Sequence, residues 1–135
     1  MTPLTQRGLE MAKILLVDDD VDLVAMNTKV LEAHGHRVLV AYSSDEARLI
    51  LRDETPDVAV LDVMMESMSA GFTLAREINH LHPDMPIFMV SAIKEKTGLG
   101  FSGLEDDHWL PVFNFLDKPF SPDKLAEKIA SVLAK

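Results

Sequence analysis

The stretch Lys13-Ile-Leu-Leu-Val-Asp-Asp-Asp20 joins an apolar run to a group of acidic residues. A second apolar run, Val58-Ala-Val-Leu61, ends in the same way at Asp62. The second run has no polar alternation, which is typical of a central parallel strand buried on both faces. Parallel α/β sheets place their ligand sites at the carboxyl ends of the strands. We therefore expect Asp18, Asp19 and Asp62 to meet in one crevice.

Three carboxylates in one crevice repel each other unless a cation lies among them. The grouping therefore predicts a divalent metal site, with Asp62 left for a second role. Taken singly, Asp18 and Asp19 are ordinary helix-capping residues and Asp62 is an ordinary turn residue. Their joint position at the ends of apolar strands favours the metal site.

The remaining sequence alternates strand and helix patterns. Strands are expected at 13–17, 37–41, 58–61, 86–91 and 112–116, and helices at 21–33, after Ser43, at 72–81 and from Pro122. Asp20 and Ser121 are expected to cap helices, Ser43 and Glu46 to form a capping box, and Gly35 to end a helix. Strands joined by helical crossovers predict an α/β fold with a doubly wound, five-stranded parallel sheet.

A crossover helix is missing from the pattern between the last two strands. Residues 92–111 contain three glycines within six positions, which disfavours a helix and predicts a long loop in place of the fourth helix. The run Gly98-Leu-Gly-Phe-Ser-Gly103 also spells a dinucleotide-binding fingerprint. That fingerprint works directly after a first strand and at the start of a helix, so nucleotide binding is disfavoured here.

Composition predicts one domain and a restricted set of partners. The 135 residues are 47% hydrophobic, contain no cysteine and carry a net charge of −9. With no basic stripe, direct nucleic-acid binding is disfavoured, and no apolar run is long enough for membrane insertion. We expect a cytoplasmic protein with an N-terminal extension at 1–11 and one domain at 12–135.

Two further strand ends carry polar groups suited to binding an anion. Ser91 ends the fourth expected strand, and Lys118 follows the fifth. A hydroxyl can donate a hydrogen bond and an ammonium can pair with an anion, so both side chains are expected to face the same crevice as the carboxylates. A lysine before a turn proline can also be an ordinary surface residue.

The motifs together resemble the receiver domain of two-component response regulators, of the stand-alone, chemotaxis-regulator-like type. The resemblance covers about 12–135, in order and spacing, and rests on four segments: Lys13-Ile-Leu-Leu-Val-Asp-Asp-Asp20, Val60-Leu-Asp-Val-Met-Met65, Val90-Ser-Ala92 and Leu116-Asp-Lys-Pro-Phe120. It implies a flavodoxin-like sheet with strand order 2-1-3-4-5.

The resemblance also implies a role for individual residues. Asp62 is the expected phosphoacceptor, and Mg²⁺ is expected on Asp18, Asp19, Asp62 and the backbone carbonyl of Met64. Ser91 and Ala92 belong to the expected phosphate-binding and switch segment, together with Lys118, which pairs with phosphate, and Phe115, the switch aromatic. The peptide bond before Pro119 is expected to be cis.

The implied function is that of a phosphoacceptor in a phosphorelay. A sensor histidine kinase or a histidine phosphotransfer protein supplies the phosphoryl group, and the signal leaves through contact with a downstream protein. The chain is then not an enzyme, apart from its own phosphorylation and dephosphorylation. One alternative is a degenerate receiver that acts as a phosphorylation-independent interaction module. Another is a phosphatase of the haloacid-dehalogenase type, but Met64 stands where such enzymes carry a second aspartate.

Several positions depart from the family pattern or stay open. Glu66 stands where receivers usually carry proline, and the following loop to Gly71 is one residue longer than usual. Trp109 either packs onto the sheet edge or belongs to a partner-binding patch. The histidine pairs, 34 with 36 and 80 with 82, are expected to be exposed turn residues rather than metal ligands.

Overall fold

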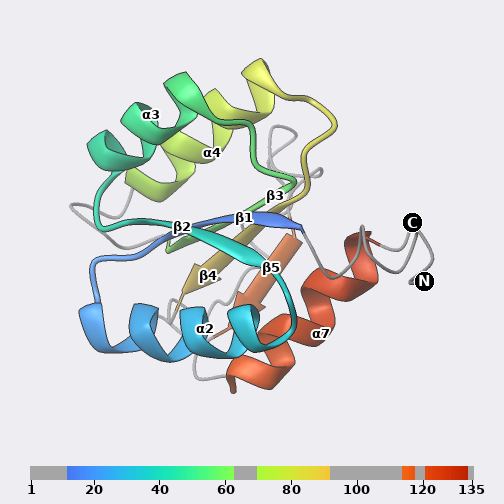
Figure 1. Cartoon of the computed structure of the whole chain (residues 1–135). Helices are drawn as coiled ribbons and strands as arrows, with labels where there is room; N and C mark the ends of the chain where they lie inside the picture. The colour runs from blue at the N-terminus through green and yellow to red at the C-terminus, as the bar shows by residue number, and fades with distance from the viewer. Residues whose placement is uncertain (1–11, 63–69, 92–113, 118–120, 134–135) are drawn as a thin grey trace.

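The chain forms an α/β domain with helices on both faces of one sheet (Figure 1). The computed structural model describes residues 12–62, 70–91, 114–117 and 121–133. Several expectations fall outside these ranges: the extension at 1–11, Glu66 and its loop, the loop at 92–111 with its glycine motif, and Trp109.

The sheet is parallel throughout and has the strand order β2-β1-β3-β4-β5. Its strands are β1 (Lys13–Val17), β2 (Arg37–Ala41), β3 (Val58–Asp62), β4 (Ile87–Ser91) and β5 (Asn114–Asp117). Both the predicted fold class and the predicted order 2-1-3-4-5 are confirmed. The order changes direction around β1 and β3, the place where such sheets form a ligand crevice.

Two helical layers cover the sheet. The helices α3 (Ser44–Asp53) and α4 (Ala70–Leu81) lie on one face, and α2 (Val21–Ala33) and α7 (Pro122–Leu133) lie on the other (Figure 1). Alternate residues of each strand therefore enter two separate cores. Leu15, Val17 and Leu61 pack in the core under α3 and α4, while Ile14, Leu16 and Val60 pack under α2 and α7.

The two strands in the middle of the sheet, β1 and β3, are almost completely buried. Every residue of β3 is buried, as its unbroken apolar sequence predicts. In β1 all residues after Lys13 are buried. At about 1.5–3 kcal/mol for each fully buried aliphatic side chain, these two strands supply a large part of the free energy that opposes unfolding.

The predicted helix caps are present. Asp20 Oδ1 accepts a hydrogen bond from the Leu23 N–H at 3.1 Å, and Ser43 Oγ accepts one from the Glu46 N–H at 3.1 Å. The Glu46 carboxylate completes the capping box one residue earlier than the standard pattern, by accepting from the Tyr42 N–H at 2.9 Å. Gly35 has a φ of 90°, the left-handed conformation that follows a helix end.

Element bounds differ from the predicted ones by at most two residues within the described ranges. β3 continues through Asp62, α4 begins at Ala70 rather than Phe72, and β4 begins at Ile87 because Pro86 has no N–H to donate. β5 continues to Asp117, whereas its expected start at 112 and 113 lies outside the described residues.

His36 is buried, so the prediction that it is an exposed turn residue is wrong. Only 8% of its surface is exposed, because its backbone N–H donates to the Leu31 carbonyl and turns the chain directly into β2. Its Nδ1 is buried and has no hydrogen-bond partner. Burial, together with the nearby His34, lowers the pKa of His36 below its usual value.

We expect His36 to make the fold less stable in mild acid. The unfolded chain binds a proton at this imidazole near pH 6.5, whereas the folded chain does so only at lower pH. Stability should therefore fall as pH drops below about 6.5, until His36 is protonated in the folded state as well. Urea unfolding at pH 7.5 and pH 5.5 measures this loss.

The substitution His36→Gln should reduce the difference in unfolding free energy between the two pH values. His34→Gln, at an exposed position, should leave most of that difference. Equal pH sensitivity in all three proteins would contradict the assignment to His36.

Candidate functional site

The three predicted acidic residues come together at the carboxyl ends of β1 and β3. Val17 pairs with Leu61 in the parallel register of these strands, so Asp18 and Asp62 are the next residues on adjacent strands. Carboxylate oxygens of Asp18, Asp19 and Asp62 all lie within 4.8 Å of one another. The prediction that the three carboxylates come together is therefore confirmed.

The backbone around Asp18 holds its carboxylate in place. Its N–H donates to the Ala41 carbonyl at 3.1 Å, which ties the end of β1 to the end of β2. Its Oδ1 accepts a hydrogen bond from the Asp20 N–H at 2.9 Å. Asp20 in turn caps α2, so a single turn orients Asp18 and starts the helix. Sequence reasoning predicted the cap but missed the bond from Asp20 to Asp18, although aspartate commonly bonds its own backbone two residues on.

The exposure of the three residues differs. Asp18 is 5% exposed and Asp62 is 6% exposed, whereas Asp19 reaches the surface. Burying carboxylates near one another costs free energy unless positive charge or hydrogen-bond donors compensate it. The N-terminus of α2, which follows directly, supplies a partial positive charge.

The donor set fits Mg²⁺. This ion prefers oxygen ligands and is usually bound by one or two carboxylates, with further positions for water or phosphate oxygens. Asp18, Asp19 and Asp62 provide oxygen donors at a spacing that one cation can bridge. Within the described ranges they are the only group of three or more metal-ligating side chains this close, and it includes neither histidine pair.

The other predicted site residues are placed only in part. Val90 of β4 pairs with Asp62 of β3. The next residue, Ser91, is the last of β4 and pairs with Asp117 of β5. Phe115 lies in β5 opposite Met89. Met64, Ala92, Lys118 and Pro119 lie outside the described residues, so their roles stay predictions.

The sequence matches the family model of the response regulator receiver domain over residues 14–130. Curated relatives carry the same region. A transcriptional regulatory protein of Bacillus subtilis, YvrH, is 38% identical over 133 residues, which are 94% of this chain and 51% of that protein. The phosphate regulon regulator PhoB of Pseudomonas aeruginosa is 33% identical over 124 residues, 90% of this chain and 52% of PhoB. The chain thus spans about half the length of these relatives.

Solved structures show the same fold. A receiver domain protein described as CheY-like from Methanospirillum hungatei superposes with a TM-score of 0.77 at 27% identity, over 91% of this chain and 94% of that one. The chemotaxis response regulator CheY4 of Vibrio cholerae superposes with a TM-score of 0.73 at 28% identity, over 90% of this chain and 98% of that one. Within the part of this chain that the structure describes, no helix combines the length and apolarity needed to cross a membrane.

We expect Mg²⁺ to bind the native acidic cluster and raise its stability. A ligand that binds only the folded state stabilises it by RT ln(1 + [L]/Kd), about 2.7 kcal/mol at a hundredfold excess over Kd. Thermal unfolding with increasing MgCl₂, at constant ionic strength, measures this effect.

Asp18→Asn should abolish the Mg²⁺-dependent increase in Tm and, without Mg²⁺, should raise Tm because one like charge is removed. Asp53→Asn, at an exposed position at the end of α3, serves as the control and should keep the full increase. A metal-dependent increase that persists in Asp18→Asn would rule out this cluster as the site.

Proposed function

The chain belongs to the response regulator receiver domain family, and from this premise we propose that it accepts a phosphoryl group on Asp62 from a histidine kinase or a histidine phosphotransfer protein. Phosphorylation-based two-component signalling is what the family implies. The assignment of the acceptor to Asp62 goes further and rests on one observation: this residue is 6% exposed, and its carboxylate lies beside two others at the carboxyl end of the sheet.

The position of Asp62 separates its role from those of its neighbours. It ends β3, the central strand with partners on both sides, so its backbone is held between β1 and β4. Asp18 is oriented by the turn that starts α2, and Asp19 is exposed to solvent. A rigidly held carboxylate suits a nucleophile, because in-line phosphoryl transfer depends on positioning and electrostatics.

In the proposed reaction an Asp62 carboxylate oxygen attacks the phosphorus of a phosphohistidine donor. The new O–P bond forms as the P–N bond breaks, and the imidazole leaves with the electron pair of that bond. Mg²⁺, when bound, neutralises charge on the transferring group. Asp18 and Asp19 would hold it, together with Asp62 and the Met64 carbonyl, and would keep it beside the attacking oxygen.

The proposed response to phosphorylation involves the neighbouring strand ends. The phosphoryl group brings additional negative charge and three acceptor oxygens. Ser91, the Ala92 segment and Lys118 would bind those oxygens, with the bond before Pro119 in the cis form. Phe115 would then fill the space that Ser91 vacates. The place of Ser91 at the end of β4, beside β3, supports its part in this proposal.

The proposed setting is a cytoplasmic phosphorelay with a protein as the downstream target. The sensor kinase is implied by the family, whereas the absence of direct nucleic-acid contact by these residues is our inference from their net charge of −9. Relatives such as YvrH are named transcriptional regulators, so DNA contact by the whole protein is a separate question. We propose no catalysis beyond the protein's own phosphorylation and dephosphorylation.

Incubation with acetyl phosphate and Mg²⁺ should add one phosphoryl group to the chain, as measured by intact-protein mass spectrometry. Asp62→Asn should remove the adduct, because an amide cannot form the acyl phosphate. Asp18→Asn should slow its formation by weakening Mg²⁺ binding.

The control Asp53→Asn should be labelled like the unsubstituted protein. Labelling that survives in Asp62→Asn would place the acceptor elsewhere. No labelling of the native chain, even with a phosphorylated histidine phosphotransfer protein as donor, would favour the phosphorylation-independent interaction module.

A further inference from the structure

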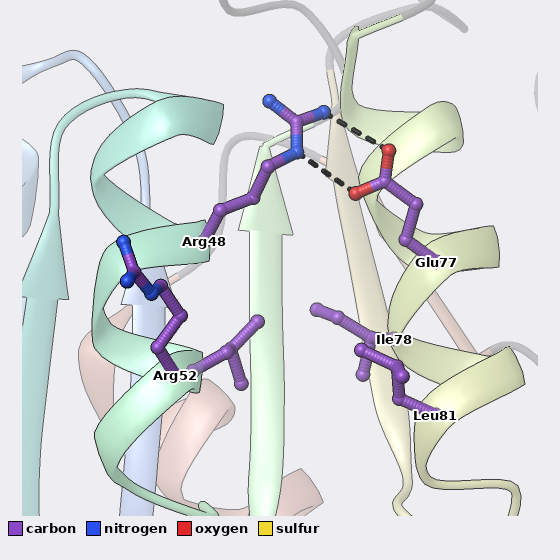
Figure 2. A pocket seen from close by; sticks show the side chains of 6 residues that line it. Arg48, Arg52, Glu77, Ile78 and Leu81 are labelled. Atoms are coloured by element: carbon purple, nitrogen blue, oxygen red, sulfur yellow. Dashed lines mark hydrogen bonds and ion pairs between the residues drawn. The ribbon is translucent and has the colours of Figure 1, made fainter.

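A pocket of about 330 Å³ lies between α3 and α4, outside the acidic crevice. Figure 2 shows the two helices facing each other, with the side chains of Arg48, Glu77, Ile78 and Leu81 directed toward the space between them. The lining combines three apolar residues, Leu51, Ile78 and Leu81, with two arginines and one glutamate, Arg48, Arg52 and Glu77. Pockets that take small ligands or anchor side chains have this size and mixture.

The floor of the pocket is apolar and one wall is open to water. Ile78 is fully buried and belongs to the core under α3 and α4, and Leu51 packs against that core. Leu81, the last residue of α4, is 63% exposed although it borders the same pocket. A ligand that covers Leu81 would remove apolar surface from water and gain affinity from that burial.

One end of the pocket is closed by a two-pronged ion pair between the helices. Arg48 Nε donates to Glu77 Oε2 at 2.8 Å, and Arg48 Nη2 donates to Glu77 Oε1 at 3.2 Å (Figure 2). Arg48 also pairs with Asp45 at 2.8 Å. The hydrogen bonds to Glu77 raise the pKa of Arg48 above its usual value, despite some desolvation. The charge of Arg48 is thus matched within the protein.

The second arginine differs from the first. Arg52 lies one helical turn after Arg48 and also lines the pocket. Within the described parts of the chain it makes no ion pair or hydrogen bond through its guanidinium, and Figure 2 shows that group turned away from Glu77. On a protein of net charge −9, a cation that has no partner among the described residues and lies beside an apolar pocket is a point of charge complementarity for an acidic ligand.

From this arrangement we propose that the pocket between α3 and α4 binds a short segment of a partner protein that carries an apolar side chain next to a carboxylate. The apolar side chain enters between Leu51, Ile78 and Leu81. The carboxylate pairs with Arg52, whose long side chain can swing to the opening. A pocket of this volume holds one or two side chains, so the contact is weak unless other surfaces add to it.

This surface is independent of the acidic site. It lies on the α3 and α4 face, and none of its lining residues contributes to the carboxylate cluster. The inference therefore goes beyond the proposed phosphoryl transfer, and it can be tested on protein that has never been phosphorylated.

The test uses two blocked tripeptides, acetyl-Leu-Glu-Leu-amide and acetyl-Leu-Lys-Leu-amide, titrated into ¹⁵N-labelled protein at low ionic strength. The acidic peptide should give saturable backbone shifts confined to α3 around Leu51 and α4 around Leu81. Its affinity should exceed that of the basic peptide by about two- to fivefold, the usual range for one exposed ion pair.

Three variants separate the two halves of the contact. Arg52→Glu should reverse the preference between the peptides, and Leu81→Ser should weaken both peptides by about three- to tenfold through lost apolar contact. Leu49→Ser is the matched control, since Leu49 is 57% exposed on α3 but does not line the pocket, and it should change neither affinity.

Four results would overturn the proposal. Shifts spread over the whole surface, or an equal response in Leu49→Ser and Leu81→Ser, would mean nonspecific apolar contact. An unchanged preference in Arg52→Glu would remove the carboxylate from the contact. Shifts in the same residues that grow with protein concentration alone would assign the pocket to a second copy of this chain.

Discussion

The structure depends on holding like charges together at the end of its most buried strands. Asp18 and Asp62 are almost fully buried, and their oxygens lie within 4.8 Å of each other and of Asp19. Such a group destabilises the fold when nothing compensates it. The apolar side chains of β1 and β3 are buried in both cores, and this burial stabilises the fold. It also fixes the backbone that carries Asp18 and Asp62. Burial of these strands thus adds to the local compensation that Asp18 receives from the Asp20 N–H and from the N-terminus of α2.

The turn after β1 links this site to the rest of the fold. Asp18 bonds to Ala41 of β2 through its N–H and to Asp20 through its carboxylate, and Asp20 then caps α2. Three consecutive acidic residues therefore perform three different tasks. Asp18 is buried and oriented, Asp19 is exposed beside the other carboxylates, and Asp20 caps the helix that follows. Their order in the sequence is set by the geometry of one strand-to-helix turn.

The sequence predicted the fold well where local chemistry decides it. β1, α2 and β2 have the predicted bounds because an apolar run, a capping aspartate and a helix-ending glycine mark each boundary. The meeting of Asp18, Asp19 and Asp62 followed from a general property of parallel sheets and needed no knowledge of side-chain positions. The start of α4 was missed by two residues because Ala70 and Gly71 carry no apolar periodicity that separates a helix from the preceding loop.

Contacts between segments that are far apart in the sequence could not be predicted from the sequence pattern. His36 looked like a turn residue beside Gly35, and only the packing of β2 shows that it is buried. The ion pair between Arg48 and Glu77 joins residues 29 positions apart on different helices. Taken singly, each residue is typical of a solvated charge on an amphipathic helix. Neither the ion pair nor the pocket beside it could therefore be predicted from the sequence.

The distribution of charge distinguishes the two ends of the sheet. At the amino end Glu54 pairs with both Lys13, at 3.1 Å, and Arg37, at 3.4 Å, and Asp57 accepts a hydrogen bond from the Lys13 N–H. Opposite charges meet there at half-exposed positions, where each pair contributes little more than about 1 kcal/mol. At the carboxyl end like charges are gathered and partly buried instead. The two ends of the sheet therefore differ in charge pattern, and the gathered carboxylates mark the carboxyl end as the candidate functional site.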